Sequence, residues 1–329
     1  MTTNIKFVSY AEDLPGPRWK EKFDCFWPGY RAWYLRSSLA LRPSYVECRR
    51  ALRKFMPELL PIWQALIELS GGSDIEARFL SMWCPPAYIM GCSQTVWIDP
   101  ANREEPVLLR NYDFAPALLE GAWTATRWLG QRTICMSDCL WGALDGLNEA
   151  GLAASLSFGG RKAYGPGFGV PLMLRYILET AETVRDAARI LSALPSSMSY
   201  NIALLDKGGD WATVFVAPDR PAEVVREKTT TNLQHRVEWE AHAKATRAVE
   251  RLNHLNKIAA SAVRSNIVIK SLLTPPLFQT RYGNGYGTLY TAIYRPQSAA
   301  AALVWPKESW QQLLPTFNDG EREITYAAE

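Results

Sequence analysis

The sequence predicts an α+β protein in which antiparallel sheets are covered on the outside by helices. Runs of strand-forming residues recur in pairs, with a short turn between the two members of each pair. A helical pair separates two groups of these runs, and the chain shows no regular strand–helix–strand alternation. Of the 329 residues, 48% are hydrophobic and 21% are charged, so the chain can bury a large core as one compact domain.

The N-terminal segment is predicted to be mostly helical up to about residue 70. Apolar residues in 42–70 recur at spacings of three and four, and the "GGS" that follows is typical of a helix end. Pro57 and Pro61 divide this stretch into two or three helical pieces, because proline interrupts a helix interior.

Strand signals begin at Cys92. The runs "SQTVWID" and "PVLLRNYDF" flank the turn cluster "PANREE", and they predict a hairpin with Cys92 at its start. Further runs follow in "TRWLG", "RTICMSD" and "GLAASLSF". Residues 170–194 have the spacing of a helical pair, and "YNIALLDKGGDWATVFVA" predicts a hairpin about "DKGGD". A helix is expected over 236–262, and "GTLYTAIYRPQSAAAALVW" predicts a last hairpin about "RPQS".

Composition argues against several classes of partner. The net charge is +3, from 36 basic and 33 acidic residues, with no basic run dense enough to follow a nucleic-acid backbone. The N-terminus lacks the pattern of a secretory signal, and no apolar run is long enough to span a membrane. We therefore expect a cytoplasmic protein without nucleic-acid or membrane partners. Whether it forms a homo-oligomer is left open.

No cofactor or metal is expected from local motifs. Neither a G-x-G-x-x-G sequence nor a P-loop occurs. Cys135 and Cys139 in "CMSDC" have no second cysteine or histidine pair at ligand spacing, because the three histidines lie far along the chain. The six cysteines are expected to stay reduced in a cytoplasmic chain of this length.

Cys92, which follows Gly91, has two interpretations. A cysteine at a strand end is often a small buried apolar residue. Alternatively, cleavage of the Gly91–Cys92 bond would give Cys92 a free α-amine with a pKa of about 7.7–8.0, which suits a general base. Gly91 would favour that cleavage because it leaves the preceding carbonyl carbon open to the thiol.

Three downstream residues support the second interpretation. Arg110 and Asp113 in "RNYDF" lie on opposite faces if the strand is regular, or share one cleft if a bulge or strand end occurs near Asn111. Arg110 near the thiol would lower its pKa, and Asp113 would orient the amine. Asn232 in "TTTNLQH" is either a turn residue or an amide donor for an oxyanion.

These motifs resemble the acyl-coenzyme A:6-aminopenicillanic acid acyltransferase family of N-terminal-nucleophile hydrolases (peptidase C45 type). The resemblance covers about residues 75–300 and rests on "GCSQT", "LLRNYDF", "GLNEAGLAASLSFGG", "YNIALLD", "TNLQH" and "GTLYTAIYRP", in the family's order. The "RN-x-DF" and "GLNEAGL" motifs are also similar to choloylglycine and penicillin V hydrolases. Where those hydrolases have an asparagine, this chain has Ser157 or Phe158, which argues against bile salts and penicillin V as substrates.

The resemblance implies a four-layer αββα sandwich made as an inactive precursor. Self-cleavage at Gly91–Cys92 would separate a helical segment, 1–91, from a catalytic core, 92–329, and the cleaved segment would stay bound. By motif matching, Cys92 is the nucleophile, and its own amine, oriented by Asp113, is the base. Arg110 matches the arginine of the bile-salt hydrolase motif, and Asn232 is implied to help form the oxyanion hole. Ser157, Asn201 and Thr288 lie in matched motifs, and their roles are implied less directly.

The resulting functional hypothesis is a self-processing cysteine amidohydrolase that acts on a linear, non-peptide, small-molecule amide through a Cys92 thioester. Hydrolysis is preferred because water needs no acceptor site. One alternative is an acyltransferase that passes the acyl group to an amine, with a coenzyme A thioester as a possible co-substrate. A second alternative is a catalytically silent binding or scaffold protein of the same fold.

Overall fold

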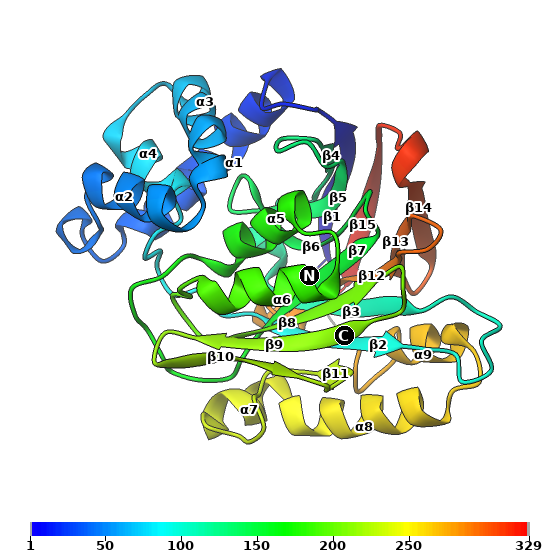
Figure 1. The fold of residues 1–329 in the computed structure, drawn as a ribbon. Helices are drawn as coiled ribbons and strands as arrows, with labels where there is room; N and C mark the ends of the chain where they lie inside the picture. The colour runs from blue at the N-terminus through cyan, green and yellow to red at the C-terminus, as the bar shows by residue number, and fades with distance from the viewer. Residues whose placement is uncertain (1, 328–329) are drawn as a thin grey trace.

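Two stacked β-sheets form the centre of the molecule in the computed structural model, which describes residues 2–327 (Figure 1). The nine-stranded sheet has the order β10-β9-β8-β7-β6-β5-β4-β1-β15, and the six-stranded sheet has the order β11-β2-β3-β12-β13-β14. The strands are β1 (Thr2–Ala11), β2 (Gly91–Trp97), β3 (Val107–Phe114), β4 (Ala122–Thr126), β5 (Thr133–Asp138), β6 (Gly142–Asn148), β7 (Leu152–Phe158), β8 (Tyr200–Asp206), β9 (Trp211–Ala217), β10 (Arg220–Val225), β11 (Thr229–Thr230), β12 (Gly287–Arg295), β13 (Ala300–Trp305), β14 (Glu308–Leu313) and β15 (Gly320–Ala327).

Helices cover the outer face of each sheet. Helices α5 (Val170–Thr180) and α6 (Val184–Ala193) pack on the nine-stranded sheet, whereas α8 (Ala248–Ser261) and α9 (Ser265–Leu272) pack on β2 and β3 of the six-stranded sheet. The inner faces meet where β2 and β3 contact β7 and β8. This is the predicted αββα sandwich, which the structure confirms.

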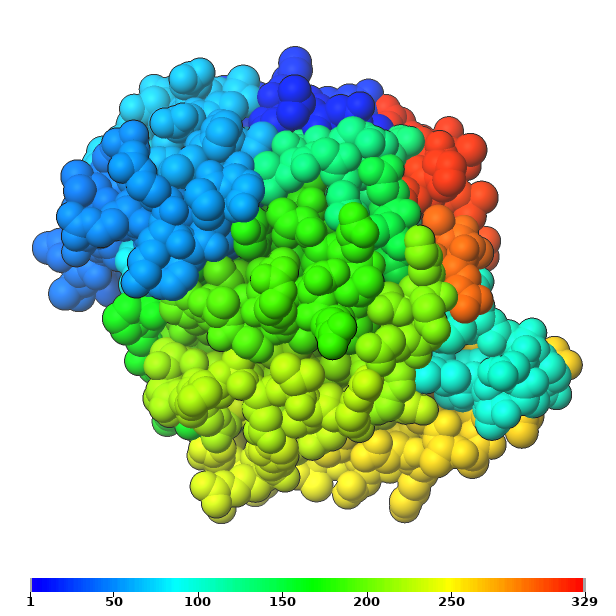
Figure 2. Space-filling view, in the orientation of Figure 1, coloured from blue at the N-terminus to red at the C-terminus, as the bar shows by residue number. Residues whose placement is uncertain are grey.

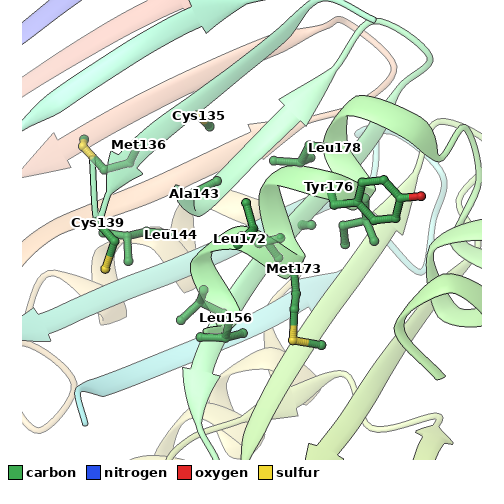
Figure 3. Close-up of a cluster of buried hydrophobic side chains, with 14 of the residues drawn as sticks. Cys135, Met136, Cys139, Ala143, Leu144, Leu156, Leu172, Met173, Tyr176 and Leu178 are labelled. Carbon is green, nitrogen blue, oxygen red and sulfur yellow. The ribbon is translucent and has the colours of Figure 1, made fainter. Parts of the chain in front are cut away.

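A cluster of buried hydrophobic side chains lies between α5 and the nine-stranded sheet (Figure 3). Leu172, Met173 and Leu178 of α5 pack on side chains of β6 and β7, among them Leu144 and Leu156, and all are inaccessible to solvent. Burying each such side chain stabilises the fold by about 1.5–3 kcal/mol. Cys135 and Cys139 belong to the same core as free thiols. Over residues 2–327, no three metal-ligating side chains come together.

The N-terminal helices gather at one side of the sandwich, where they form the blue lobe of Figures 1 and 2. They are α1 (Pro17–Leu35), α2 (Tyr45–Phe55), α3 (Leu60–Ser70) and α4 (Asp74–Leu80). The proline-divided stretch 42–70 is helical as predicted, with the short 3₁₀ helix η2 (Pro57–Leu59) at the break. The remaining 3₁₀ helices are η1 (Leu39–Leu41), η3 (Pro116–Leu118), η4 (Tyr282–Asn284) and η5 (Leu314–Thr316).

Two sequence expectations were wrong. Residues Thr2–Ala11 form a strand, not a helix, because Phe7 and Ser9 are buried on alternate positions in a pattern of period two. This strand, β1, pairs with β4 in parallel, so the larger sheet is not purely antiparallel. A parallel pair needs a long crossover, and residues 12–121 supply it.

The other predicted elements are close to those observed. The hairpins β2–β3, β8–β9 and β12–β13 and the helical pair α5–α6 are confirmed. The helix expected over 236–262 begins later and is divided into α7 (Glu240–Thr246) and α8, because Arg247 has a left-handed backbone with φ of 53°. Of the helices described, none has both the length and the apolar character to traverse a bilayer.

Candidate active site

Cys92 lies at the start of β2, an inner strand of the six-stranded sheet, and is fully buried. Arg110 on the neighbouring strand β3 donates from Nη2 to Cys92 Sγ over 3.2 Å. Across the sandwich, Asp145 on β6 forms a buried ion pair with Arg110 and accepts hydrogen bonds from Tyr290, at 2.8 Å, and Tyr294. The sandwich therefore holds a cation against the thiol, with its carboxylate counterion behind it.

Burial dominates the acidity of this thiol. Removal from water raises the pKa of Cys92 above its usual value, and the adjacent Arg110 opposes that increase only in part. In the intact chain the thiol is therefore protonated at neutral pH, with a cation already in place for the thiolate.

Asn232 holds the backbone on both sides of the Gly91–Cys92 bond. Its Oδ1 accepts from the Cys92 amide nitrogen at 3.1 Å, and its Nδ2 donates to the carbonyl oxygens of Met90 and Phe158, both at 3.1 Å. The residue lies two positions after β11, whose two residues pair with β2. The amide thus fixes the position of the candidate cleavage site.

Arg251 on α8 is a central residue that the sequence analysis missed. Its Nη1 donates to the Cys92 carbonyl oxygen at 2.7 Å and to Asp113 Oδ2 at 3.1 Å, and its Nη2 donates to Asn232 Oδ1 at 2.7 Å. A signal was present, because Ala248, Arg251 and Leu255 share the buried face of one helix. An arginine at such a position requires a buried partner.

Asp113 and Arg110 lie on opposite faces of β3, as expected for a regular strand. The β2–β3 register is continuous, and the irregularity in this region lies on β12 between Thr288 and Tyr290. Asp113 accepts from Thr288 Oγ1 at 2.7 Å as well as from Arg251, and it is the ladder partner of Gly91. Burial raises the pKa of Asp113, while Arg251 opposes the increase.

Ser157 and Asn201 support the site from one layer further away. Ser157 Oγ donates to the Thr231 carbonyl at 3.2 Å, and Asn201 Nδ2 donates to the carbonyls of Thr231 and Leu233 at 2.9 and 3.1 Å. These bonds hold the segment that carries Asn232. Thr288, in contrast, directly contacts Asp113.

A groove of about 390 Å³ opens beside the segment that precedes Gly91. Helix α1, residues 87–89 and the end of β3 form its mostly apolar wall: Phe26, Gly29, Tyr30, Trp33, Arg36, Ala87, Tyr88, Ile89, Phe114, Ala117, Leu118 and Asp138. Tyr88 connects the groove to the site, because its hydroxyl lies 3.0 Å from that of Tyr112, the ladder partner of Cys92.

At the base of the groove lies a second buried polar cluster, which we call the Asp138 cluster: Lys22, Tyr30, Tyr88, Glu120 and Asp138. The Tyr30 hydroxyl lies 2.7 Å from Glu120 Oε1 and 3.2 Å from Asp138 Oδ1, and Lys22 pairs with Glu120 at 3.1 Å. Tyr88 donates to Asp138 Oδ2 at 2.5 Å. Burial, and then the charge of Glu120, raise the pKa of Asp138 to about 7.

Comparison with known proteins identifies the family. No curated protein matches the chain. Similar solved structures include penicillin V acylase from Agrobacterium tumefaciens, at 16% identity and TM-score 0.49 over 68% of this chain and 86% of that one. They also include a Caenorhabditis elegans N-acylethanolamine-hydrolyzing acid amidase ortholog, at 16% identity and TM-score 0.46 over 63% and 93%. A mutant conjugated bile acid hydrolase from Clostridium perfringens has 10% identity and TM-score 0.42 over 70% and 96%.

The family match covers most of the chain that follows Cys92. The sequence profile of the acyl-coenzyme A:6-aminopenicillanic acid acyl-transferase family matches residues 100–310. This range contains Arg110, Asp113, Asn232 and Arg251, whereas Cys92 precedes it. More than half of the chain is therefore matched, and the αββα sandwich observed here is the one that the sequence motifs implied. The chain belongs to the acyl-coenzyme A:6-aminopenicillanic acid acyl-transferase family and is an enzyme of the class that hydrolyses or transfers acyl groups.

Proposed function

We propose that this protein is a cysteine amidohydrolase that activates itself by cutting its own Gly91–Cys92 bond. The observation that supports it most is that separate side chains hold each polar group of Cys92. Arg110 contacts the thiol, Asn232 the amide nitrogen and Arg251 the carbonyl oxygen. A cysteine that served only as a buried apolar residue would need none of these charged partners.

Self-cleavage in this proposal is an acyl shift followed by hydrolysis. The Cys92 sulfur attacks the Gly91 carbonyl carbon, the C–S bond forms and the C–N bond breaks, and the Cys92 nitrogen takes up the thiol proton. Water then attacks the thioester, which releases the Gly91 carboxyl group and restores the thiol. Asn232 supports this step by keeping Met90 and Cys92 in place on either side of Gly91.

The mature enzyme would use the new α-amine as its base. The amine accepts the thiol proton as sulfur attacks a substrate amide, and it returns that proton to the departing amine. Asp113 is proposed to orient the amine, because it lies opposite Gly91 in the ladder and is itself fixed by Thr288 and Arg251. Asn232 is proposed to contribute its amide N–H to the oxyanion hole.

The substrate is proposed to be a small-molecule amide whose acyl part lies in the groove beside residues 87–89. The groove is lined mostly by aromatic and aliphatic side chains, and one of them, Tyr88, lies within hydrogen-bond distance of Tyr112, the ladder partner of Cys92. Transfer of the acyl group to an amine, with a coenzyme A thioester as a co-substrate, is the second candidate, and the description of the matched family favours it. The N-terminal piece is proposed to remain bound, since β1 lies between β4 and β15.

The intact mass of freshly purified protein under denaturing conditions tests this proposal. The uncut chain weighs 37.0 kDa, and cleavage is expected to give pieces of roughly 10 and roughly 27 kDa, the larger beginning at Cys92. Cys92→Ala is expected to stay uncut and to lack amidase activity, whereas Cys135→Ala, which alters a buried core thiol, serves as the control. Full amidase activity in Cys92→Ala would refute the assignment.

A further inference from the structure

The hydroxyl group of Tyr286 occupies the space where a side chain at Gly91 would begin. A Cβ atom added to Gly91 would lie 1.7 Å from Tyr286 Oη, 2.8 Å from its Cζ and 3.1 Å from Asp113 Cβ. Distances below 3 Å are incompatible with a close-packed interior, so no L-amino acid with a side chain fits beside this ring. Throughout the described chain, no hydrogen-bond partner is found for this buried hydroxyl. Its contact with Gly91 is therefore steric.

The intact chain shows how an acyl group is presented to the Cys92 thiol. In self-cleavage the reacting carbonyl belongs to Gly91, and its α-carbon is the Gly91 Cα. A substrate amide must place its own carbonyl carbon within reach of the same sulfur. Self-cleavage and substrate turnover would pass through the same kind of thioester on Cys92, so the α-carbon of a substrate acyl group would take the place of the Gly91 Cα, facing Tyr286.

We propose that Tyr286 makes the mature enzyme selective for acyl groups with an unbranched α-carbon. This inference rests on the proposed function and specifies its substrate class: amides of apolar acyl groups that begin with a CH₂ unit. The rest of the acyl chain lies in the groove beside Ala87, Tyr88 and Ile89, which form part of its wall. A methyl branch at the position of an L-residue's Cβ would meet the Tyr286 ring.

Self-cleavage provides a test in which the chain is its own substrate. The rate for Gly91 is compared with that for Gly91→Ala in three backgrounds: Tyr286, Tyr286→Phe and Tyr286→Ala. We expect Gly91→Ala to slow cleavage about tenfold or more with Tyr286. The same loss is expected with Tyr286→Phe, because Cζ at 2.8 Å still blocks the Cβ. With Tyr286→Ala the loss is expected to shrink to about threefold or less, since only Asp113 Cβ at 3.1 Å remains.

The outcomes separate this inference from the proposed function. If the unmodified chain does not cleave itself, the proposed function fails. If it does cleave, and Gly91→Ala is tolerated equally in all three backgrounds, Tyr286 is not a steric filter. Loss of cleavage in Tyr286→Ala with Gly91 retained would also overturn the inference, because it would place Tyr286 in the cleavage chemistry.

The processed enzyme provides a second readout with added amides. The probes are the 4-nitroanilides of hexanoic acid and of the two enantiomers of 2-methylhexanoic acid. The enantiomer whose methyl group corresponds to an L-residue's Cβ is expected to have a kcat/KM about tenfold or more below that of the unbranched amide. Tyr286→Ala is expected to bring the two values within about threefold. Equal kcat/KM values for the branched and unbranched probes in the processed enzyme would refute the selectivity.

Discussion

Two of the buried polar clusters in residues 2–327 are similar in size and differ in their charge balance. The first, the Cys92 cluster, consists of Cys92, Arg110, Asp113, Asp145, Asn232 and Arg251. Each of its two carboxylates is paired with its own arginine. The Asp138 cluster has two carboxylates, Glu120 and Asp138, but only Lys22 as a cation within salt-bridge distance.

This difference determines where protons can be held. In the Cys92 cluster the two ion pairs balance their own charges, and the neutral thiol adds none. In the Asp138 cluster one tyrosine hydroxyl, that of Tyr30, lies between two carboxyl groups and has a single proton to donate. If Tyr30 donates its proton to Glu120, a proton on Asp138 can complete the hydrogen bond between Asp138 and Tyr30. This agrees with a pKa of Asp138 that is raised to about 7. The Cys92 cluster therefore holds paired charges, whereas the Asp138 cluster binds a proton on Asp138.

Removing an arginine from the charge-balanced cluster is expected to have the largest effect. Arg251→Met leaves Asp113 buried without its cation, and we expect the free energy of unfolding to fall by about 3–5 kcal/mol. Urea denaturation in a Cys92→Ala background, where the chain stays intact, measures this loss. With Cys92 retained, self-cleavage is expected to be abolished, because the Cys92 carbonyl and Asn232 lose the same donor.

An exposed ion pair provides the matched control for that variant. Arg127 and Glu149 pair at 3.0 Å with both side chains about 40% exposed, so Arg127→Met is expected to cost less than about 1 kcal/mol. In the double variant Arg251→Met/Asp113→Asn, part of the stability should return. Equal losses of unfolding free energy for Arg127→Met and Arg251→Met would show that Asp113 does not depend on Arg251 to balance its buried charge.

The proton held at Asp138 is expected to appear as a pH dependence of stability. The folded-state pKa of about 7 lies above the ordinary value of 3.8, so the folded state binds the proton more tightly than the unfolded state does. The contribution of Asp138 to stability is therefore expected to be largest at low pH, to fall as pH rises from about 4 to about 7, and to level off above. The slope is at most about 1.4 kcal/mol per pH unit.

Asp138→Asn is the variant that isolates the contribution of Asp138 to the pH dependence of stability. Its amide can accept from Tyr88 and donate to Tyr30, as a protonated Asp138 would, but it does not titrate. Urea denaturation of the Cys92→Ala protein at pH 5 and pH 8 is expected to show a smaller pH slope with Asp138→Asn than without it. Asp24→Asn, at an exposed carboxylate of α1, is the control, and an unchanged slope in Asp138→Asn would show that the proton is held elsewhere.

The smallest effect is expected where the two clusters are connected. Tyr88→Phe removes the hydroxyl that accepts from Tyr112 and donates to Asp138. We expect a stability loss of about 1 kcal/mol in the Cys92→Ala background, measured by urea denaturation. Self-cleavage, followed by intact mass, should slow by less than about tenfold, because Asn232 still holds Met90. Complete loss of cleavage would mean that the Tyr88 hydroxyl takes part in the cleavage reaction and does not only position its neighbours.

The sequence predicted those parts of the fold that have a local pattern. The hairpins β8–β9 and β12–β13 each consist of two apolar runs about a short turn. In the N-terminal helices, Pro57 and Pro61 mark where the helical stretch is interrupted. Strand β1 has a pattern too, but its partners lie more than a hundred residues away, and only packing of the whole sheet selects them. Its parallel pairing could not be predicted from local signals.

The candidate site shows the same limit. Cys92, Arg110, Asp113 and Asn232 stand in recognisable motifs, and the structure brings them to one place. Arg251 lies in a helix without such a motif, and its importance depends on how α8 lies against β2. The Tyr286 contact with Gly91 is similarly invisible in the sequence, because it depends on the path of the loop before β12.

The position of β1 has a consequence for the order of events during protein synthesis. Among the strands of this sheet β1 is synthesised before the others, yet Thr2–Ser9 pair with Gly320–Ala327 of β15, which is synthesised after the others. The nine-stranded sheet thus cannot be completed on a partly synthesised chain, whatever the helices do in the meantime. An activity that needs the finished sandwich therefore cannot begin until β15 has left the ribosome.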